Sequence, residues 1–174
     1  FILPLEGGQT VPVQNPYAYG NAWIIDKVTY VDNANAELAR VGKIDLRHEA
    51  VADKRFKAVL GDSKKQDGES IVKLTSYAPN RLTYDVSTTK GGVIVFAENY
   101  YPGWTALVDG KEVEIGRVNY VLRAISVTAG RHKVELSFFP KTVNTTEYIA
   151  YAAYVVILLA ILLLVFLYFR KKES

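Results

Sequence analysis

Residues 148–169 read YIAYAAYVVILLAILLLVFLYF, a run without charge, proline or glycine. As an α-helix this run would rise about 33 Å at 1.5 Å per residue, which is enough to cross a hydrocarbon core of about 30 Å. Tyrosines stand near both ends of the run, where the aromatic belts of membrane proteins lie. The rest of the chain is too small to bury so apolar a helix on every face. The run therefore predicts a transmembrane helix over residues 148–169.

Basic residues on both sides of this run predict its orientation. Three of them follow the run at positions 170–172, and Arg131, Lys133 and Lys141 precede it. The counts tie, but long folded domains are translocated largely regardless of charge, whereas short juxtamembrane segments obey the positive-inside rule. We therefore expect a cell-membrane protein in contact with the lipid bilayer. Residues 1–147 would be extracytoplasmic and residues 170–174 a cytoplasmic basic tail.

The start of the sequence carries a further expectation. Its first residue is Phe1, and the apolar run lies at the C-terminal end, where a cleavable signal peptide does not occur. We expect a processed chain or a piece of a longer protein. Either another membrane span or a removed signal would then precede Phe1.

The composition of the 174 residues excludes several classes of protein. The absence of cysteine excludes a disulfide scaffold, a cysteine-ligated zinc site and a thiol nucleophile. The net charge is +3, and the tail supplies two of these charges because its three basic residues are offset by Glu173 alone. The remaining domain is nearly neutral, so the sequence lacks the electrostatic footprint of a nucleic-acid-binding protein.

Residues 70–139 have the two-residue periodicity of half-buried strands. Apolar and polar side chains alternate over residues 81–87, 121–127 and 133–138, while residues 93–96 form the continuous apolar run of a strand covered on both faces. Asp109-Gly110 predicts a tight hairpin, because both turn positions need positive φ. Such close strands without an intervening helical pattern predict a mainly β fold, an antiparallel β-sandwich of the jelly-roll or immunoglobulin type.

The organisation of the remaining chain is less regular. Residues 23–31 and 51–60 each predict a strand, and residues 61–68 predict an exposed polar loop. Between the two strands, Ala34, Leu38 and Val41 share one face of a short helix that Asp32 or Asn33 could cap.

These patterns divide the chain into five segments. We expect residues 1–69 to be the N-terminal part of the extracytoplasmic domain, 70–141 the core strands of the sandwich, 142–147 a polar linker, 148–169 the transmembrane helix and 170–174 the tail.

Catalytic and metal-binding patterns are absent from the sequence. The only histidines, His48 and His132, have no second ligand at a metal-binding spacing, and no phosphate-binding or nucleophile motif occurs. Glu112 and Glu114 stand two residues apart directly after the predicted hairpin, which favours a solvated face over a catalytic carboxylate pair. We therefore expect no catalytic residue, no metal and no cofactor.

The segment Tyr100-Tyr101-Pro102-Gly103-Trp104 is the one feature suited to recognition. Flat rings at a turn can stack on sugars, and a nearby amide such as Asn119 could bind hydroxyls. The alternative, which the usual burial of large aromatic side chains favours, is that Trp104 and one tyrosine fill the end of the sandwich. Tyr100, Tyr101, Trp104 and Asn119 are therefore candidate glycan contacts with a structural alternative.

Several strings of the sequence together resemble one protein family. They are ENYYPGW at residues 98–104, VDGKEV at 108–113, RVNYVLRA at 117–124 and AGRHKVE at 129–135, with further similarity at 15–23 and 51–56. As a set they resemble the C-terminal end of the bacterial YfhO family of membrane proteins. The resemblance carries over Tyr101, Pro102, Gly103, Trp104, Asp109, Gly110, Asn119 and Arg123 as signature positions without assigned roles.

What the resemblance implies is a large polytopic membrane protein similar to GT-C-type glycosyltransferases, which use lipid-linked sugars on the outer face of the membrane. This chain would be its non-catalytic C-terminal module and last helix, because the catalytic acidic residues of that fold lie in loops between N-terminal helices. The module would pack over the catalytic cavity or position an acceptor glycan. Its partners would be the rest of the parent protein and an envelope glycan or lipid-linked sugar, in envelope polysaccharide or teichoic-acid-type glycosylation.

A protein of a different class also fits the sequence. It is an independent single-span surface protein that serves adhesion or binds a partner. The two hypotheses differ in what precedes Phe1. A polytopic parent predicts several hydrophobic spans there, and a single-span protein predicts a signal sequence.

Overall fold

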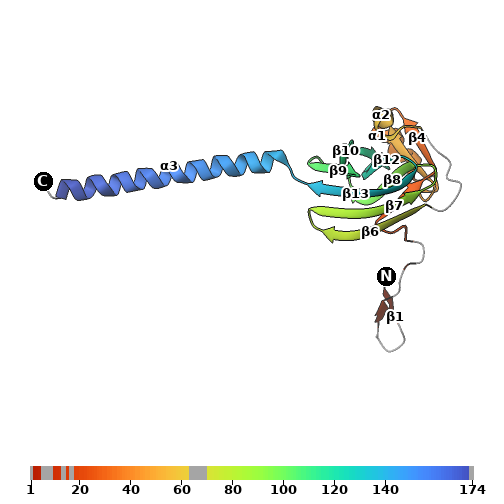
Figure 1. Cartoon of the computed structure of the whole chain (residues 1–174), viewed down its shortest axis with the longest axis horizontal. Coiled ribbons are helices and arrows are strands. Elements are labelled where there is room, and N and C mark those ends of the chain that lie inside the picture. The colour runs from red at the N-terminus through yellow and green to blue at the C-terminus, as the bar shows by residue number, and fades with distance from the viewer. Residues whose placement is uncertain (1, 5–9, 13–14, 16–17, 63–69, 173–174) are drawn as a thin grey trace. The chain divides into compact units, whose positions relative to one another are not determined.

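The computed structural model describes residues 2–4, 10–12, 15, 18–62 and 70–172, and the chain divides into two units, Phe1–Ser137 and Phe138–Ser174 (Figure 1). The first unit is built mainly of strands, and the second contains one long helix. The predicted mainly β fold with a C-terminal apolar helix is thereby confirmed. Two short strands near the N-terminus, β1 (Ile2–Pro4) and β2 (Thr10–Pro12), form an antiparallel pair of their own.

Two larger sheets form the sandwich. One has five strands in the order β10-β9-β13-β7-β6, and the other has four in the order β11-β12-β8-β3. The strands of the first sheet are β6 (Ile71–Ala78), β7 (Arg81–Thr88), β9 (Trp104–Val108), β10 (Lys111–Val113) and β13 (Gly130–Phe138). Those of the second are β3 (Ala22–Ile25), β8 (Gly92–Asn99), β11 (Gly116–Val118) and β12 (Leu122–Val127).

Apolar side chains from both sheets meet in the main core. Those of the five-stranded sheet come from alternate positions of β7, β9 and β13, and those of the four-stranded sheet come mainly from β8 and β12. The buried members of this core are Ala22, Leu82, Tyr84, Val86, Ile94, Phe96, Ala106, Ile125, Val127, Val134 and Leu136. This contact of two inner faces makes the architecture a β-sandwich.

Strand β8 is covered on both faces, as its continuous apolar run predicts. Ile94 and Phe96 enter the main core, while Val93 and Val95 belong to a second core on the other face of the four-stranded sheet. All four side chains are at most 4% exposed.

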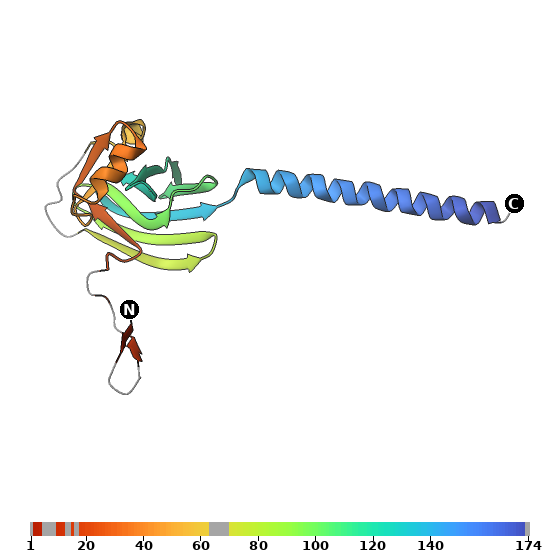
Figure 2. The same ribbon diagram turned by 180° about the vertical axis from the view of Figure 1, so that it is seen from behind.

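A lobe of residues 27–60 supplies the rest of the second core. It contains β4 (Lys27–Val31), α1 (Ala34–Val41), β5 (Glu49–Asp53), the 3-10 helix η1 (Lys54–Phe56) and α2 (Lys57–Leu60). Its helices lie together with β4 on one side of the sandwich, as both views show (Figures 1 and 2). Strands β4 and β5 pair in parallel, because α1 returns the chain in the same direction between them. This parallel pair differs from the antiparallel pairing that the sequence predicts.

The lobe also departs from the sequence in its boundaries. The predicted strand over residues 23–31 is divided by a bend at Asp26, and the one over 51–60 ends at Asp53. The Asp53 carboxylate accepts a hydrogen bond from the Arg55 amide at 3.0 Å and so caps η1. The predicted loop over 61–68 lies mostly outside the described residues, which omit 63–69.

Helix α1 occupies the predicted residues, but its buried face is not the predicted one. Of the two candidate caps, Asn33 accepts from the Ala36 amide at 3.0 Å. Glu37 is fully buried, whereas Leu38 is 58% exposed. An apolar stripe therefore does not orient this helix.

Hairpin β9–β10 confirms the turn predicted at Asp109-Gly110. Val108 pairs with Lys111, and the turn residues have φ of 52° and 80°. The Asp109 carboxylate also accepts from the Lys133 amide at 2.8 Å and lies 2.7 Å from His132 Nδ1. The hairpin is thus fastened to β13.

Helix α3 (Lys141–Lys172) forms the second unit, and its residues 145–171 are long and apolar enough to cross a membrane. Residues 142–147, which the sequence analysis describes as a polar linker, belong to this helix. They contain no glycine or proline to interrupt the helix, and Pro140 stands directly before it.

Candidate functional site

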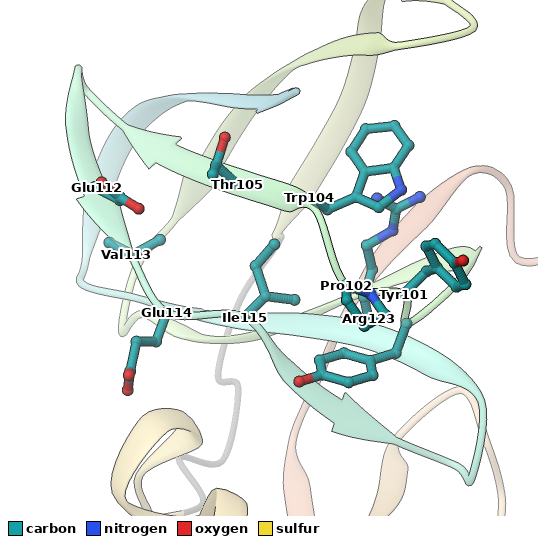
Figure 3. Close-up of a pocket in the computed structure, with 10 residues that line it drawn as sticks. Tyr101, Pro102, Trp104, Thr105, Glu112, Val113, Glu114, Ile115 and Arg123 are labelled. Atoms are coloured by element: carbon teal, nitrogen blue, oxygen red, sulfur yellow. The ribbon is translucent and has the colours of Figure 1, made fainter. Parts of the chain in front are cut away.

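The loop between β8 and β9 borders a hollow of about 430 Å³, a volume within the range of ligand pockets, about 300–1,000 Å³ (Figure 3). Strands β9, β10 and β12 and the segment after β10 supply the other walls. The lining residues are Tyr100, Tyr101, Pro102, Trp104, Thr105, Glu112, Val113, Glu114, Ile115 and Arg123. Hereafter this cavity is called the hollow.

Three of the four candidate glycan contacts lie at the hollow. Tyr101 is 63% exposed, Tyr100 is 38% exposed and Trp104 is half-buried. The Tyr100 ring contacts the Phe56 ring edge to face with centroids 5.7 Å apart, so one side of Tyr100 rests on the lobe. Each of the three rings therefore exposes part of its surface to solvent, and Tyr100 also packs against Phe56.

A buried arginine fixes the position of the Trp104 indole. The Arg123 guanidinium carbon lies 3.8 Å from the centroid of the indole, and Glu98 accepts a hydrogen bond from Arg123 Nη2. Arg123 is 2% exposed. Burial lowers the pKa of Arg123, and the Glu98 charge opposes that shift. Because such a stack adds cation–π attraction to apolar contact, the indole has a fixed support.

The remaining hydrogen-bonding capacity of Arg123 is unused. Among the residues that the structure describes, its Nε and Nη1 atoms are buried and have no acceptor. The sequence contains a signal for this arginine, since Arg123 occupies an inward position in the alternation of residues 121–127. Only the fold reveals which acid and which ring surround it.

Acidic side chains form the other side of the hollow. Glu112 and Glu114 are both exposed, as expected for the strand after the hairpin, and lie across the hollow from Trp104 in Figure 3. Within the described part of the chain neither carboxylate has an ion pair.

Asn119, the fourth candidate, does not line the hollow. It is 7% exposed, and its side-chain oxygen accepts from the Val51 amide at 2.9 Å. The backbone N–H of Asn119 donates to the Val51 carbonyl at 2.7 Å. Asn119 and Tyr120 have φ of 51° and 72°, so the turn between β11 and β12 is left-handed at two consecutive residues. The position of Asn119 is structural.

Glu37 completes this structural cluster. Its carboxylate accepts from Arg117 Nη2 and from the Tyr120 amide, both at 2.8 Å. The contacts connect α1 of the lobe to the turn that contains Asn119. We call Glu37, Val51, Arg117, Asn119 and Tyr120 the clamp. Sequence reasoning missed the clamp, because the residues next to Glu37 in the sequence do not indicate that its side chain is buried.

The histidines take part in hydrogen bonds to single carboxylates. His48 Nδ1 lies 2.9 Å from Asp26, and His132 Nδ1 lies 2.7 Å from Asp109. The bond from His132 and the bond from the Lys133 amide lower the pKa of Asp109. Over the described residues, no group of three or more potential ligands could hold a metal ion.

A model of the bacterial membrane protein YfhO matches residues 45–150, which is more than half of the chain. The chain belongs to the YfhO family. The part matched to YfhO contains every residue that lines the hollow, the clamp residues from Val51 onward and the beginning of α3, but not Glu37. No curated protein and no solved structure matches the chain.

Proposed function

We propose that this chain is the C-terminal extracytoplasmic module and last membrane helix of a polytopic YfhO protein. The parent protein would act in envelope glycosylation with lipid-linked sugars, of the polysaccharide or teichoic-acid type. The module itself would be non-catalytic and would contact glycan through the hollow. The YfhO match supports this function over that of an independent single-span adhesion protein.

The observation that best supports a glycan contact is the group of aromatic rings at the hollow. A sugar presents apolar C–H faces and hydroxyl edges, so it needs a flat ring and polar groups close together. Trp104 provides the ring on a fixed base, and Tyr101 provides a second ring with 63% of its surface exposed. Glu112 and Glu114 provide hydroxyl acceptors on the opposite side.

The glycan contact can be tested by titrating envelope glycans into the 174-residue chain held in lipid nanodiscs. We expect Trp104→Ala and Tyr101→Ala to weaken binding at least about fivefold each, because each removes a stacking surface worth about 1 kcal/mol. Tyr77→Ala is the matched control, since Tyr77 is 66% exposed and does not line the hollow. Equal affinities of the parent chain and both hollow variants would contradict the glycan contact.

The proposed orientation has a separate test, because the chain contains no cysteine. Ser76→Cys places one thiol at an exposed position of β6, and Ser174→Cys places one in the tail. A membrane-impermeant maleimide added to intact cells should label only the Ser76→Cys variant. Labelling of Ser174→Cys alone would reverse the orientation.

The role as a module of a larger protein depends on what precedes Phe1. Determination of the coding sequence upstream of Phe1 distinguishes the two classes. Several hydrophobic spans are expected for a polytopic parent. A signal sequence alone would favour the single-span protein.

A further inference from the structure

The charges around the hollow indicate which glycans it accepts. Three charged side chains line it, namely Glu112, Glu114 and Arg123. The Arg123 charge is offset by Glu98, with which it forms an ion pair, and its guanidinium is covered by Trp104. The two remaining carboxylates are exposed and have no ion pair with any described residue. The unbalanced charge of the hollow is therefore negative.

Arg123 does not make the hollow an anion site. An anion would need the guanidinium exposed, but its side chain is only 2% exposed. An anion would also face two carboxylates, and like charges without a bridging cation repel. The unpartnered Nε and Nη1 atoms of Arg123 remain donors at a residue that lines the hollow. Both atoms are buried, however, so they contact neither an anion nor a neutral ligand in the hollow.

We propose that the hollow selects a glycan unit that carries a free, protonated amino group. This inference rests on the proposed glycan contact and names the class of its ligand. The sugar ring stacks on Trp104 or Tyr101, and its ammonium group lies toward Glu112 and Glu114. The two carboxylates then supply both the charge and the hydrogen-bond acceptors that an ammonium needs.

Two oligosaccharides with the same backbone provide a direct test. Glucosamine oligomers carry free amines, and N-acetylglucosamine oligomers of the same length are neutral. Calorimetric titration uses the 174-residue chain in nanodiscs of zwitterionic lipid, so that the bilayer does not attract the cationic oligomer. We expect the glucosamine oligomer to bind about fivefold more tightly at low salt, since exposed charge pairs have modest energies. The preference should shrink as salt screens the charges.

Variants of the acidic side chains connect the preference to the hollow. The double variant Glu112→Gln with Glu114→Gln should bind both oligomers equally, because it lacks the two charges that attract the ammonium group. Asp62→Asn with Asp85→Asn is the matched control, because it removes two exposed carboxylates that do not line the hollow. The control should keep the preference.

Each other outcome overturns a defined part of the proposal. Equal affinity of the parent chain for both oligomers, or tighter binding of the neutral one, would refute the amine selectivity and leave the glycan contact intact. A preference that the control variant loses as well would assign it to overall charge, which also refutes the selectivity of the hollow. Absence of binding by both oligomers and by envelope glycans would refute the glycan contact together with the selectivity.

Discussion

Two arginines in the string of residues 117–124 have opposite roles in the clamp and in the hollow. Arg117 and Arg123 are register partners across β11 and β12, where like charges would repel, and each has its own glutamate. In the clamp the acid is the buried member, since Glu37 is fully buried and the Arg117 side chain is 16% exposed. In the hollow the base is the buried member, since Arg123 is 2% exposed and Glu98 is 28% exposed.

This difference indicates which of the two ion pairs contributes more to the stability of the fold. Glu37 has two donors and no access to water, so its loss leaves Arg117 and the Tyr120 amide without an acceptor. Glu98 can exchange its arginine for water, whereas Arg123 is additionally covered by the Trp104 ring. The clamp is therefore expected to determine stability, and the hollow is expected to tolerate changes that alter binding.

The largest expected effect is that of Glu37→Gln in the clamp. Glutamine has one acceptor oxygen for two donors, so we expect the free energy of unfolding to fall by about 3 kcal/mol. Urea denaturation of the chain in micelles, followed by tryptophan fluorescence, measures this loss. Leu38→Ala is the control on the same helix and should change stability by less than about 0.5 kcal/mol, because Leu38 is 58% exposed. A loss below about 1 kcal/mol for Glu37→Gln would show that the clamp is dispensable.

A smaller loss, about 2 kcal/mol, is expected for Asn119→Ala. Alanine leaves the Val51 amide unpaired in a buried site and adds strain at a positive φ. Asn119→Gly loses the same hydrogen bond without the strain, so it should be more stable than Asn119→Ala by about 1 kcal/mol. Equal stability of the two variants would mean that the left-handed backbone contributes nothing to the cost.

Glu98→Gln should cost only about 1 kcal/mol, because a neutral amide oxygen can still accept from Arg123 and solvent reaches this side chain. The same urea titration gives the change in the free energy of unfolding. Comparison with Glu37→Gln then shows how much it matters whether the acid or the base of the pair is buried. If Glu98→Gln proved as costly as Glu37→Gln, burial of the acid would not explain the difference between the two pairs.

The smallest effect concerns pH and the hairpin fastened by Asp109. Its pKa is lowered from the ordinary value of 3.8, chiefly by the hydrogen bond with His132. A lowered carboxyl pKa gives stability that is complete above this ordinary value and is lost as the pH falls through the lowered one. The melting temperature of Asp109→Asn should therefore depend less on pH in this acidic range than that of the parent chain. Parallel melting curves for the two proteins would contradict this linkage.

Much of the fold follows from local patterns. Alternation predicts β7, β12 and β13, the continuous run at Val93–Phe96 predicts a strand covered on both faces, and Asp109-Gly110 predicts a hairpin. Each of these signals depends on neighbouring residues alone. They are sufficient for the sandwich and for the apolar helix.

The clamp could not be predicted in this way, because its contacts join distant parts of the chain. Burial of Glu37 depends on Arg117 and Tyr120, which are about 80 residues away in sequence. The parallel pairing of β4 and β5 likewise depends on how α1 packs and not on the strands themselves. The sequence groups Asn119 with the rings Tyr100, Tyr101 and Trp104, but the structure places only the three rings at the hollow, and the Asn119 side chain binds the Val51 amide.

The long separation between the two halves of the clamp has a consequence for synthesis on the ribosome. Residues 27–60 emerge well before residues 117–120, so α1 waits with the Glu37 carboxylate in water and without its partners. Contacts between distant segments form late, since the intervening chain must first be closed into a loop. The lobe is therefore expected to remain susceptible to proteases in nascent chains that stop short of β12, and to become resistant once that strand has been translated.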